Sequence, residues 1–365
     1  MRIIISGGGT GGHVFPAIAI ADAIKKIRPD AELLFVGAEG KLEMEKVPAA
    51  GYQIEGLWIS GFQRKLTLQN LLFPFKLIAS SLKARQIVRR FRPDVVVGVG
   101  GYASGPVMNA AGAAGIPMVL QEQNGFPGVT NWILAKKAAK ICVAYDGMDR
   151  FFPKEKIVLT GNPVRSEVFQ NLEGKRNEGL DYFQLDKSKK TIFVFGGSGG
   201  ARSLNEALAT NTALLRERSD VQVLWQIGKF YADSYGQCDT AKLPNVQARP
   251  FIDRMDLAYA AADLVIGRAG ALSISEMCLV GKPAILVPSP NVTEDHQTKN
   301  ALALVEKQAA LMVKDVEAKE RLLWTALEVL ANVELGKRLG ENIKQLAKPN
   351  AAEEIAKVIL KLIKA

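Results

Sequence analysis

The clearest indication of the fold is the stretch Leu264-Val265-Ile266-Gly267, then Arg268-Ala269-Gly270, then Ala271-Leu272-Ser273-Ile274-Ser275-Glu276. The pattern predicts a short buried strand, a glycine turn and a helix. The first N–H groups of a helix have no acceptor within the helix, and together with the helix dipole they form an anion site. The stretch therefore predicts a phosphate-binding turn, with Glu276 placed to accept two hydrogen bonds from a ribose diol. An ordinary strand-to-helix corner capped by serine has the same pattern.

The strand-and-glycine pattern recurs elsewhere in the chain. A β-branched run at residues 2–6 is followed by Gly7-Gly8-Gly9-Thr10-Gly11-Gly12-His13. Residues 95–101 and 191–200 each show the same pattern of an apolar run followed by glycines. Strands that alternate with helices predict parallel sheets covered on both faces. The polar stretch 171–190 predicts a domain boundary nearby. We therefore expect an α/β protein with two Rossmann-like doubly wound domains that face each other across a cleft.

Composition limits the class of protein. The chain has 365 residues, more than the ~250–300 at which single cores stop growing, and 48% of them are hydrophobic. The apolar start at Met1 is too short for a signal peptide, and no run approaches the ~18–20 apolar residues that span a bilayer. Cys142, Cys238 and Cys278 lack metal-ligand spacing, which predicts reduced thiols in a cytoplasmic protein. The net charge of +10 predicts an anionic partner.

A basic segment indicates what that partner is. Between Phe62 and Arg92 the chain has eight basic residues and no acidic one. Helical spacing predicts one apolar stripe, formed by Leu71, Phe75, Ile78, Leu82 and Phe91, and a separate basic face that carries Lys76, Lys83 and Arg90. Such a helix is typical of an interfacial membrane contact, although a packed Rossmann helix with a basic outer face remains an alternative. Nucleic acid is a weaker candidate because the aromatic residues are not interleaved with the charges.

The first glycine loop leaves a different enzyme class open. Gly7, Gly9 and Gly12 satisfy the dinucleotide pattern G-x-G-x-x-G, and Glu39 follows the next apolar run. Glu39 lies later than the ~20-residue offset expected for a ribose ligand. An NAD-dependent oxidoreductase therefore stays a remote alternative.

Several motifs, taken together, resemble one family. Gly8 to Pro16, Glu122-Gln123-Asn124, Gly161 to Arg165, Gly196-Gly197-Ser198, Phe251-Ile252-Asp253 and Arg268 to Glu276 resemble the MurG family in order and spacing. The resemblance covers essentially the whole chain. It implies an inverting N-acetylglucosaminyltransferase of the GT-B fold that moves GlcNAc from UDP-GlcNAc to the 4-hydroxyl of the N-acetylmuramoyl unit of undecaprenyl-linked lipid I, giving lipid II and UDP in peptidoglycan synthesis.

The resemblance also implies an organisation for the chain. We expect an N-terminal domain at 1–162 on the acceptor and membrane side, a UDP-GlcNAc-binding domain at 163–350, and a C-terminal helix at 351–365 that packs back on the N-terminal domain. The enzyme would lie peripherally at the cytoplasmic face of the inner membrane, with Phe75, Lys76, Lys83, Arg85 and Arg89 on its membrane or acceptor face. Lipid I, an anionic membrane surface and other cell-wall synthesis proteins are the expected partners.

Site roles follow from the same resemblance. Thr10, Gly11, Gly12 and Asn124 would face the donor sugar and the acceptor; Arg165 and Ser198 would meet the nucleotide and its phosphates; Ile252 would meet the uracil through its main chain. Ala271, Leu272 and Ser273, in the turn that continues through Ile274 and Ser275, would offer N–H groups to the diphosphate. Glu276 would hold the ribose and Gln297 the sugar hydroxyls. The family often has a second glutamine after this one, where this chain has Thr298.

Chemistry narrows the catalytic candidates. Displacement of UDP needs charge stabilisation on the departing diphosphate and a base for the attacking hydroxyl. The helix that begins near Ala271 supplies the first without a metal, and the sequence has no Asp-x-Asp metal motif. We expect His13 to be the base because imidazole titrates near neutrality, with Glu122 as its competitor. Another UDP-sugar transferase of the same fold, a UDP-GlcNAc 2-epimerase and a pure binding module are the remaining alternatives.

Overall fold

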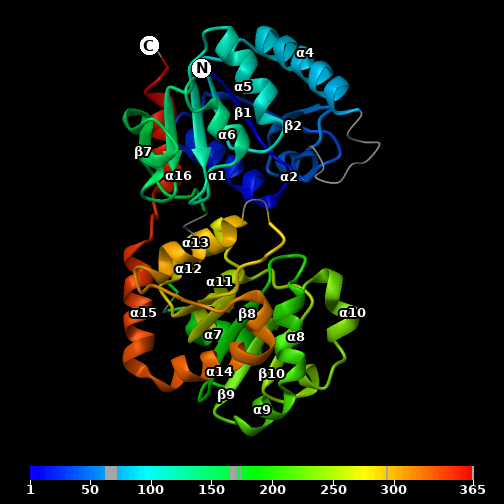
Figure 1. The fold of residues 1–365 in the computed structure, drawn as a ribbon, viewed down its shortest axis with the longest axis vertical. Helices are drawn as coiled ribbons and strands as arrows, with labels where there is room; N and C mark the ends of the chain where they lie inside the picture. Colours follow the sequence, from blue (N-terminus) through cyan, green and yellow to red (C-terminus); the bar gives the residue numbers. More distant parts are fainter. Residues whose placement is uncertain (62–71, 165–168, 170, 173, 293–294, 364–365) are drawn as a thin grey trace. The chain divides into compact units, whose positions relative to one another are not determined.

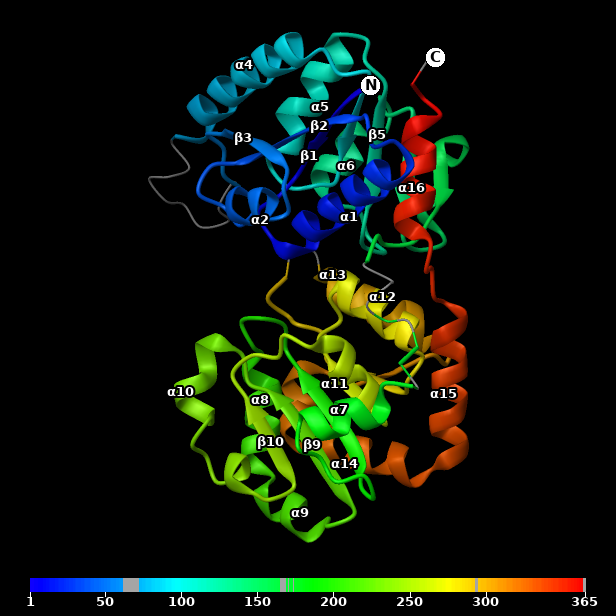
Figure 2. The same ribbon diagram turned by 180° about the vertical axis from the view of Figure 1, so that it is seen from behind.

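The computed structural model describes residues 1–61, 72–164, 169, 171–172, 174–292 and 295–363. The chain forms two compact units: an N-terminal unit of residues 1–164 with 348–365, and a C-terminal unit of residues 165–347 (Figures 1 and 2). The sequence predicted domain ends after residues 162 and 350, and the two units divide after residues 164 and 347.

A seven-stranded parallel sheet forms the centre of the N-terminal unit, with the order β3-β2-β1-β4-β5-β6-β7. Most of its strands are near-continuous apolar runs because helices cover both faces of the sheet. They are β1 (Arg2–Ser6), β2 (Glu32–Ala38), β3 (Gln53–Leu57), β4 (Val95–Gly98), β5 (Met118–Glu122), β6 (Lys140–Val143) and β7 (Ile157–Leu159).

Two helical layers enclose this sheet. One apolar cluster joins the sheet to α1, α2 and the final helix α16, and a second cluster joins the other face to α4, α5 and α6. The helices are α1 (Gly11–Ile27), α2 (Glu43–Ala49), α4 (Phe73–Phe91), α5 (Ser104–Ala113), α6 (Val129–Leu134) and α16 (Ala351–Leu360), with the 3₁₀ turns η1 (Met148–Arg150) and η2 (Lys154–Lys156). Helix α16 packs directly along α1, as both views show.

The C-terminal unit repeats the plan around a six-stranded parallel sheet with the order β10-β9-β8-β11-β12-β13. Its core includes Trp225 and Phe193, both fully buried. The strands are β8 (Lys190–Phe195), β9 (Val221–Gln226), β10 (Val246–Arg249), β11 (Leu264–Gly267), β12 (Ala284–Leu286) and β13 (Leu311–Met312).

The helices of this unit also form two layers, with α8 and α14 packed together and α7 packed against α11. They are α7 (Arg176–Tyr182), α8 (Arg202–Thr210), α9 (Thr212–Glu217), α10 (Ala232–Tyr235), α11 (Met255–Ala261), α12 (Ala271–Val280), α13 (His296–Val305), α14 (Ala318–Ala331) and α15 (Val333–Gln345). The 3₁₀ turns are η4 (Lys229–Tyr231), η5 (Thr240–Lys242) and η7 (Asp315–Glu317).

In both parallel sheets, successive strands are first added toward one edge and then, from one point on, toward the other edge. The reversal lies between β1 and β4 in the N-terminal unit and between β8 and β11 in the C-terminal unit. In open parallel sheets, ligands bind outside the carboxyl ends of the strands at such a switch point. The prediction of two doubly wound α/β domains is confirmed, and the predicted glycine loops follow the switch-point strands β1, β4, β8 and β11.

Candidate functional site

Two glycine loops pack against each other at the switch point of the N-terminal unit. The Gly8 N–H donates to the Gly100 carbonyl oxygen at 3.3 Å. Gly101 has a φ of +86°, and a Cβ there would lie 2.3 Å from the Gly8 carbonyl oxygen. The loop after β4 therefore needs glycine to support the loop after β1.

His13 is held by this first loop. Thr10 is the N-cap residue of α1, so Gly11 and Gly12 form the start of the helix and His13 lies in its first turn. The His13 Nδ1 atom is 3.2 Å from the Gly8 carbonyl oxygen and 3.3 Å from Thr10 Oγ1. Because a carbonyl oxygen only accepts, Nδ1 carries the proton in this contact. In the neutral ring, Nε2 is then the basic nitrogen, which is the form that a general base requires.

Glu43 holds the loop from the other side, a role that the sequence did not predict. Its side chain is 1% exposed. One carboxylate oxygen accepts from the Gly9 N–H at 2.8 Å and the other from the Ala38 N–H at 2.9 Å. A pyrophosphate bound to Gly9 in the manner of a dinucleotide would have to displace this buried carboxylate. Glu39, which would bind the ribose in a dinucleotide site, instead forms an ion pair with Lys83 at 3.2 Å.

Glu122 ends β5 and is almost fully buried, with 1% exposure. Its carboxylate accepts from the backbone N–H groups of Asn124 (3.1 Å) and Gly128 (3.0 Å) and from Asn131 Nδ2 (2.9 Å). Burial raises the pKa of this carboxyl above its usual range, and these hydrogen bonds oppose the shift. The contacts favour a role in shaping the loop that carries Asn124 over direct contact with a substrate.

Helix α12 provides the anion site at the switch point of the C-terminal unit. Gly270 is its N-cap residue, and the helix's own hydrogen bonds begin with the Ile274 N–H, which donates to the Gly270 carbonyl oxygen at 2.9 Å. The N–H groups of Ala271, Leu272 and Ser273 precede that bond and point out of the helix end. Ser275 Oγ donates back to the Ala271 carbonyl oxygen at 3.0 Å, so this hydroxyl serves the helix itself.

Glu276 lies one turn further along α12. Tyr259 from α11 donates its hydroxyl to the Glu276 carboxylate at 3.2 Å. Burial raises the pKa of Glu276 to about 7, and the Tyr259 hydrogen bond partly opposes this shift. The side chain is therefore about half protonated at neutral pH in the free protein.

A chain of hydrogen bonds links Ile252 to the glycine loop after β8. Gln226 Nε2 donates to the Gly197 carbonyl oxygen at 3.0 Å, and Gln226 Oε1 accepts from the Ile252 N–H at 2.9 Å. The Ile252 side chain is buried, and its N–H already donates to Gln226. The main-chain carbonyl oxygen of Ile252 is therefore the group that can accept from a nucleobase unless Gln226 moves. Ser198 is exposed on the same loop.

An aromatic residue that the sequence reasoning missed lies over this loop. Phe230, in η4 after β9, is 86% exposed. Its ring passes so close to Gly199 that a Cβ there would lie 2.9 Å from the ring. The neighbouring Lys229 ammonium lies 5.0 Å from the centre of the Phe251 ring. Both aromatic residues therefore stand at the carboxyl edge of the sheet.

Three further residues of the quoted motifs already have partners within the unit. Gln297 is the second residue of α13, and its Oε1 accepts from the Ser289 N–H at 2.8 Å. Its amide NH₂ can then donate to a ligand. Thr298 donates to Asp295 at 2.7 Å. Arg268 forms an ion pair with Asp315 and donates to the Val287 carbonyl oxygen at 3.1 Å. Its side chain therefore joins the turn before α12 to the segments that carry Val287 and Asp315. Arg165 lies outside the described residues.

The basic helix α4 differs from the predicted pattern. Phe75, Ile78 and Leu82 are exposed at 65%, 60% and 59%, while Phe91 packs on the buried face. Phe91 is nine residues beyond Leu82, or two and a half helical turns, which places it on the opposite side. Leu71 lies outside the described residues.

The basic residues of α4 divide between two faces. Lys76 donates to Ser60 Oγ at 3.1 Å, and Lys83 pairs with Glu39. Arg85 and Arg89 are both exposed. They lie seven and eleven residues after Ile78, about two and three helical turns, so they are on the same face as Phe75, Ile78 and Leu82. The outer face of α4 is therefore apolar in its first half and cationic in its second.

The described part of the chain has no helix long and apolar enough to cross a membrane. Among the same residues, no three His, Cys, Asp or Glu side chains gather as a metal site would require.

Comparison with known proteins decides the family. The sequence profile of the glycosyltransferase family 28 N-terminal domain matches residues 3–143, and that of the glycosyltransferase family 28 C-terminal domain matches residues 191–359. The chain belongs to glycosyltransferase family 28. The loops after β1, β4, β8 and β11 all lie within these two matched ranges.

Individual relatives agree with this family 28 assignment. A Bacteroides fragilis protein named UDP-N-acetylglucosamine--N-acetylmuramyl-(pentapeptide) pyrophosphoryl-undecaprenol N-acetylglucosamine transferase is 56% identical over 364 residues, which cover 99% of this chain and 96% of that protein. The crystal structure of Acinetobacter baumannii MurG is 29% identical, with a TM-score of 0.80 and 99% coverage of both chains. The predicted resemblance to MurG is confirmed.

A third relative shows how widely the family 28 fold is shared. The UDP-GlcNAc 2-epimerase from Neisseria meningitidis, solved with UDP-GlcNAc, has a TM-score of 0.69 at 13% identity, over 99% of this chain and 100% of that one. At that identity the likeness concerns the fold alone.

Proposed function

We propose that this chain transfers GlcNAc from UDP-GlcNAc to the 4-hydroxyl of the N-acetylmuramoyl unit of undecaprenyl-pyrophosphoryl lipid I, with inversion, giving lipid II and UDP for peptidoglycan synthesis. The near-full-length identity with the Bacteroides fragilis enzyme carries this proposal. The two switch-point sites support it, because one presents helix N–H groups and a ribose-binding carboxylate and the other presents an imidazole.

The C-terminal unit would bind the donor. The N–H groups at the start of α12, of Ala271, Leu272 and Ser273, would hold the diphosphate and stabilise the charge that develops on it as UDP departs. Glu276 would accept from the two ribose hydroxyls, and the Gln297 amide would donate to the sugar.

The remaining donor contacts would come from the loop beside β8. The Ile252 main chain would pair with uracil, Ser198 would meet a phosphate, and Arg165 would complete the nucleotide contacts. The helix N–H groups would themselves stabilise the negative charge of the departing UDP. We therefore propose a transfer that does not depend on a metal ion.

The N-terminal unit would bind the acceptor and supply the base. His13 Nε2 would take the proton of the acceptor 4-hydroxyl as its oxygen bonds to C1 of GlcNAc and the bond from C1 to the UDP oxygen breaks. Thr10, Gly11, Gly12 and Asn124 would line the space around the two sugars. Glu122 would keep the Asn124 loop in place.

The donor assignment can be tested by ligand-dependent stabilisation. A ligand that binds only the folded state raises the melting temperature in proportion to RT ln(1 + [L]/Kd). UDP and UDP-GlcNAc should both raise it, and NAD should not. Stabilisation by NAD alone would restore the oxidoreductase alternative and contradict the proposal.

The assignment of the base needs a separate test. His13→Ala should abolish transfer and leave the Kd of UDP-GlcNAc nearly unchanged, because the proposed contacts to the nucleotide lie in the C-terminal unit. Glu122→Gln serves as the comparison, and we expect it to lower the melting temperature as well as the activity. Near-normal kcat in His13→Ala would move the role of base to Glu122.

We also propose that α4 docks the enzyme, as a peripheral protein, on the anionic cytoplasmic face of the inner membrane, where lipid I would reside. Exposed apolar side chains such as Phe75 and Ile78 would enter the interface, and Arg85 and Arg89 would attract anionic headgroups at about 1 kcal/mol per charge. Lys76 and Lys83 would contribute less because each already has a partner.

Vesicle binding tests this docking. A variant with Phe75→Ser and Ile78→Ser should lose cosedimentation with phosphatidylglycerol vesicles and keep transfer to water-soluble acceptor analogues. Val316→Ser with Val333→Ser is the matched control, because these two apolar positions of the C-terminal unit (85% and 79% exposed) are even more exposed than Phe75 and Ile78. Undiminished vesicle binding by the α4 variant would refute the docking face.

A further inference from the structure

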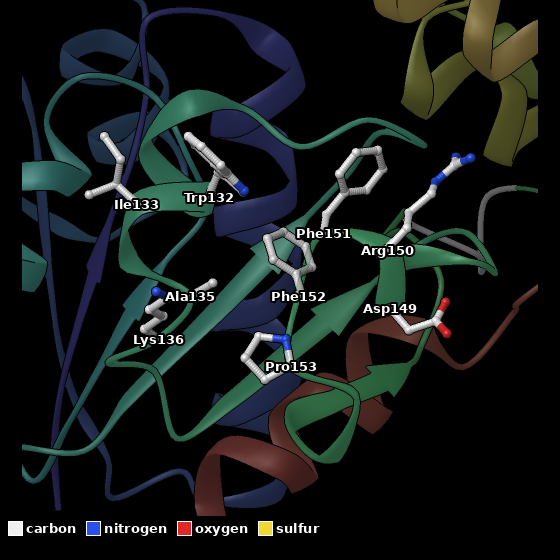
Figure 3. Close-up of a pocket in the computed structure, with 9 residues that line it drawn as sticks. All are labelled: Trp132, Ile133, Ala135, Lys136, Asp149, Arg150, Phe151, Phe152 and Pro153. Atoms are coloured by element: carbon white, nitrogen blue, oxygen red, sulfur yellow. The ribbon is translucent and has the colours of Figure 1, made fainter.

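A groove of about 490 Å³ opens in the N-terminal unit beside α6 (Figure 3). Trp132 and Lys136 line it from α6 and the turn that follows, and Phe151, Phe152 and Pro153 line it from the segment after η1. We call it the α6 groove. Its volume falls within the ~300–1,000 Å³ of pockets that hold small ligands.

The α6 groove has an apolar floor and a mostly cationic rim. Trp132 is 59% exposed although it is the largest side chain of the groove, and Phe151 is partly exposed beside it. Lys136 and Arg150 stand on the rim with one carboxylate, that of Asp149. Residues 132–156 contain six basic and three acidic side chains. An amphiphile with an anionic end complements this arrangement.

The groove is continuous with the loop that we assign to the acceptor. Arg150 Nη2 donates to the Gly125 carbonyl oxygen at 3.4 Å, and the Arg150 guanidinium lies 4.8 Å from the centre of the Phe151 ring. The rings of Phe126 and Phe151 meet edge to face with centroids 4.9 Å apart. The same loop carries Asn124. It follows β5, and η1 follows the neighbouring strand β6, so the groove begins at the carboxyl edge of the sheet.

We propose that the α6 groove holds the first isoprene units of the acceptor's polyprenyl chain, next to its pyrophosphate. This inference rests on the proposed function, which supplies an acceptor that is anionic at one end and an unsaturated hydrocarbon at the other. The cationic rim at Arg150 meets the pyrophosphate, and the apolar chain leaves the loop along Phe151 and Trp132. Polar stem peptides suit neither the floor nor the walls. A concave aromatic groove also fits one chain better than it fits a flat bilayer.

The test compares two lipid I analogues in the same detergent, one with a chain of four isoprene units and one with a methyl group in its place. Trp132→Ala should raise the KM of the prenylated analogue about tenfold, since aromatic anchors dominate apolar contacts. The KM of the methyl analogue, the KM of UDP-GlcNAc and the kcat should stay unchanged. Trp324→Ala is the matched control, because Trp324 is 57% exposed on α14 of the other unit. It should change none of these values.

Each contrary outcome has a distinct meaning. A KM for the prenylated analogue that is unchanged in Trp132→Ala overturns the inference, and so does an equal rise for both analogues. Loss of vesicle binding with unchanged KM in detergent also overturns it and makes Trp132 a bilayer contact. If the wild-type protein fails to transfer GlcNAc to the methyl analogue as well as to the prenylated one, the proposed function itself fails and the groove loses its ligand.

Discussion

Glu276 should make donor binding depend on pH. Its pKa is raised to about 7 by burial, and a bound ribose needs the ionised carboxylate to accept from both hydroxyls. Binding therefore selects the ionised form and releases a proton. The affinity for UDP-GlcNAc should rise with pH through this range and level off above it.

The size of the effect follows from the ionised fraction. With a pKa of about 7, roughly 9% of the carboxyl is ionised at pH 6 and roughly 91% at pH 8, and the apparent Kd varies inversely with that fraction. The Kd should therefore fall about tenfold between these pH values. Calorimetric titration with UDP-GlcNAc in buffers of different ionisation enthalpy measures both the Kd and the proton release. UDP-GlcNAc suits the assay because both of its phosphates are esterified and neither titrates near neutrality.

Two variants separate Glu276 from other groups. Glu276→Gln should bind more weakly with a Kd that no longer depends on pH. Tyr259→Phe removes a hydrogen bond that lowers the pKa of Glu276, so its binding curve should move to higher pH. A constant Kd in the wild-type protein, or a pH dependence that persists in Glu276→Gln, would contradict this role of Glu276.

Three further substitutions test the loops. Glu43→Gln loses one of the two hydrogen bonds that Glu43 accepts from Gly9 in the glycine loop and from Ala38 at the end of β2. Melting experiments should therefore show a loss of about 1–3 kcal/mol of folding free energy, and kcat should fall with an unchanged Kd for UDP-GlcNAc. Gly100→Ala places a Cβ 2.9 Å from His13 Nε2 at a φ of +92°, so steady-state kinetics should show a lower kcat with donor binding retained; a normal kcat would contradict this contact. Phe230→Ala should raise the KM for UDP-GlcNAc without lowering the melting temperature, because the ring is 86% exposed, whereas Val333→Ala should change neither value.

Much of the fold could be predicted because its signals are local. The apolar runs of β1, β4, β8 and β11, each followed by glycine, indicate buried parallel strands wherever they occur. Strands β3 and β13 were missed. Most of β3 is only half buried, and β13 has two residues, so neither has the apolar run that marks the others.

The candidate site could be predicted only where its residues lie within one motif. His13 and the start of α12 belong to glycine turns that the sequence displays directly. Glu43 acts on Gly9 from thirty-four positions away, and Gln226 acts on Ile252 from twenty-six, so their roles appear only when the sheets assemble. The α4 stripe was predicted correctly from Phe75 to Leu82, but its extension to Phe91 was wrong because helical rotation carries that residue to the buried side.

Transfer itself is the most direct measurement. Labelled UDP-GlcNAc is incubated with a lipid I analogue, and both the released UDP and the glycosylated product are quantified. The proposed function predicts that UDP release requires the acceptor and that one β-linked GlcNAc is added per acceptor. Release of UDP at the same rate without acceptor, or conversion of the donor sugar to N-acetylmannosamine, would contradict it.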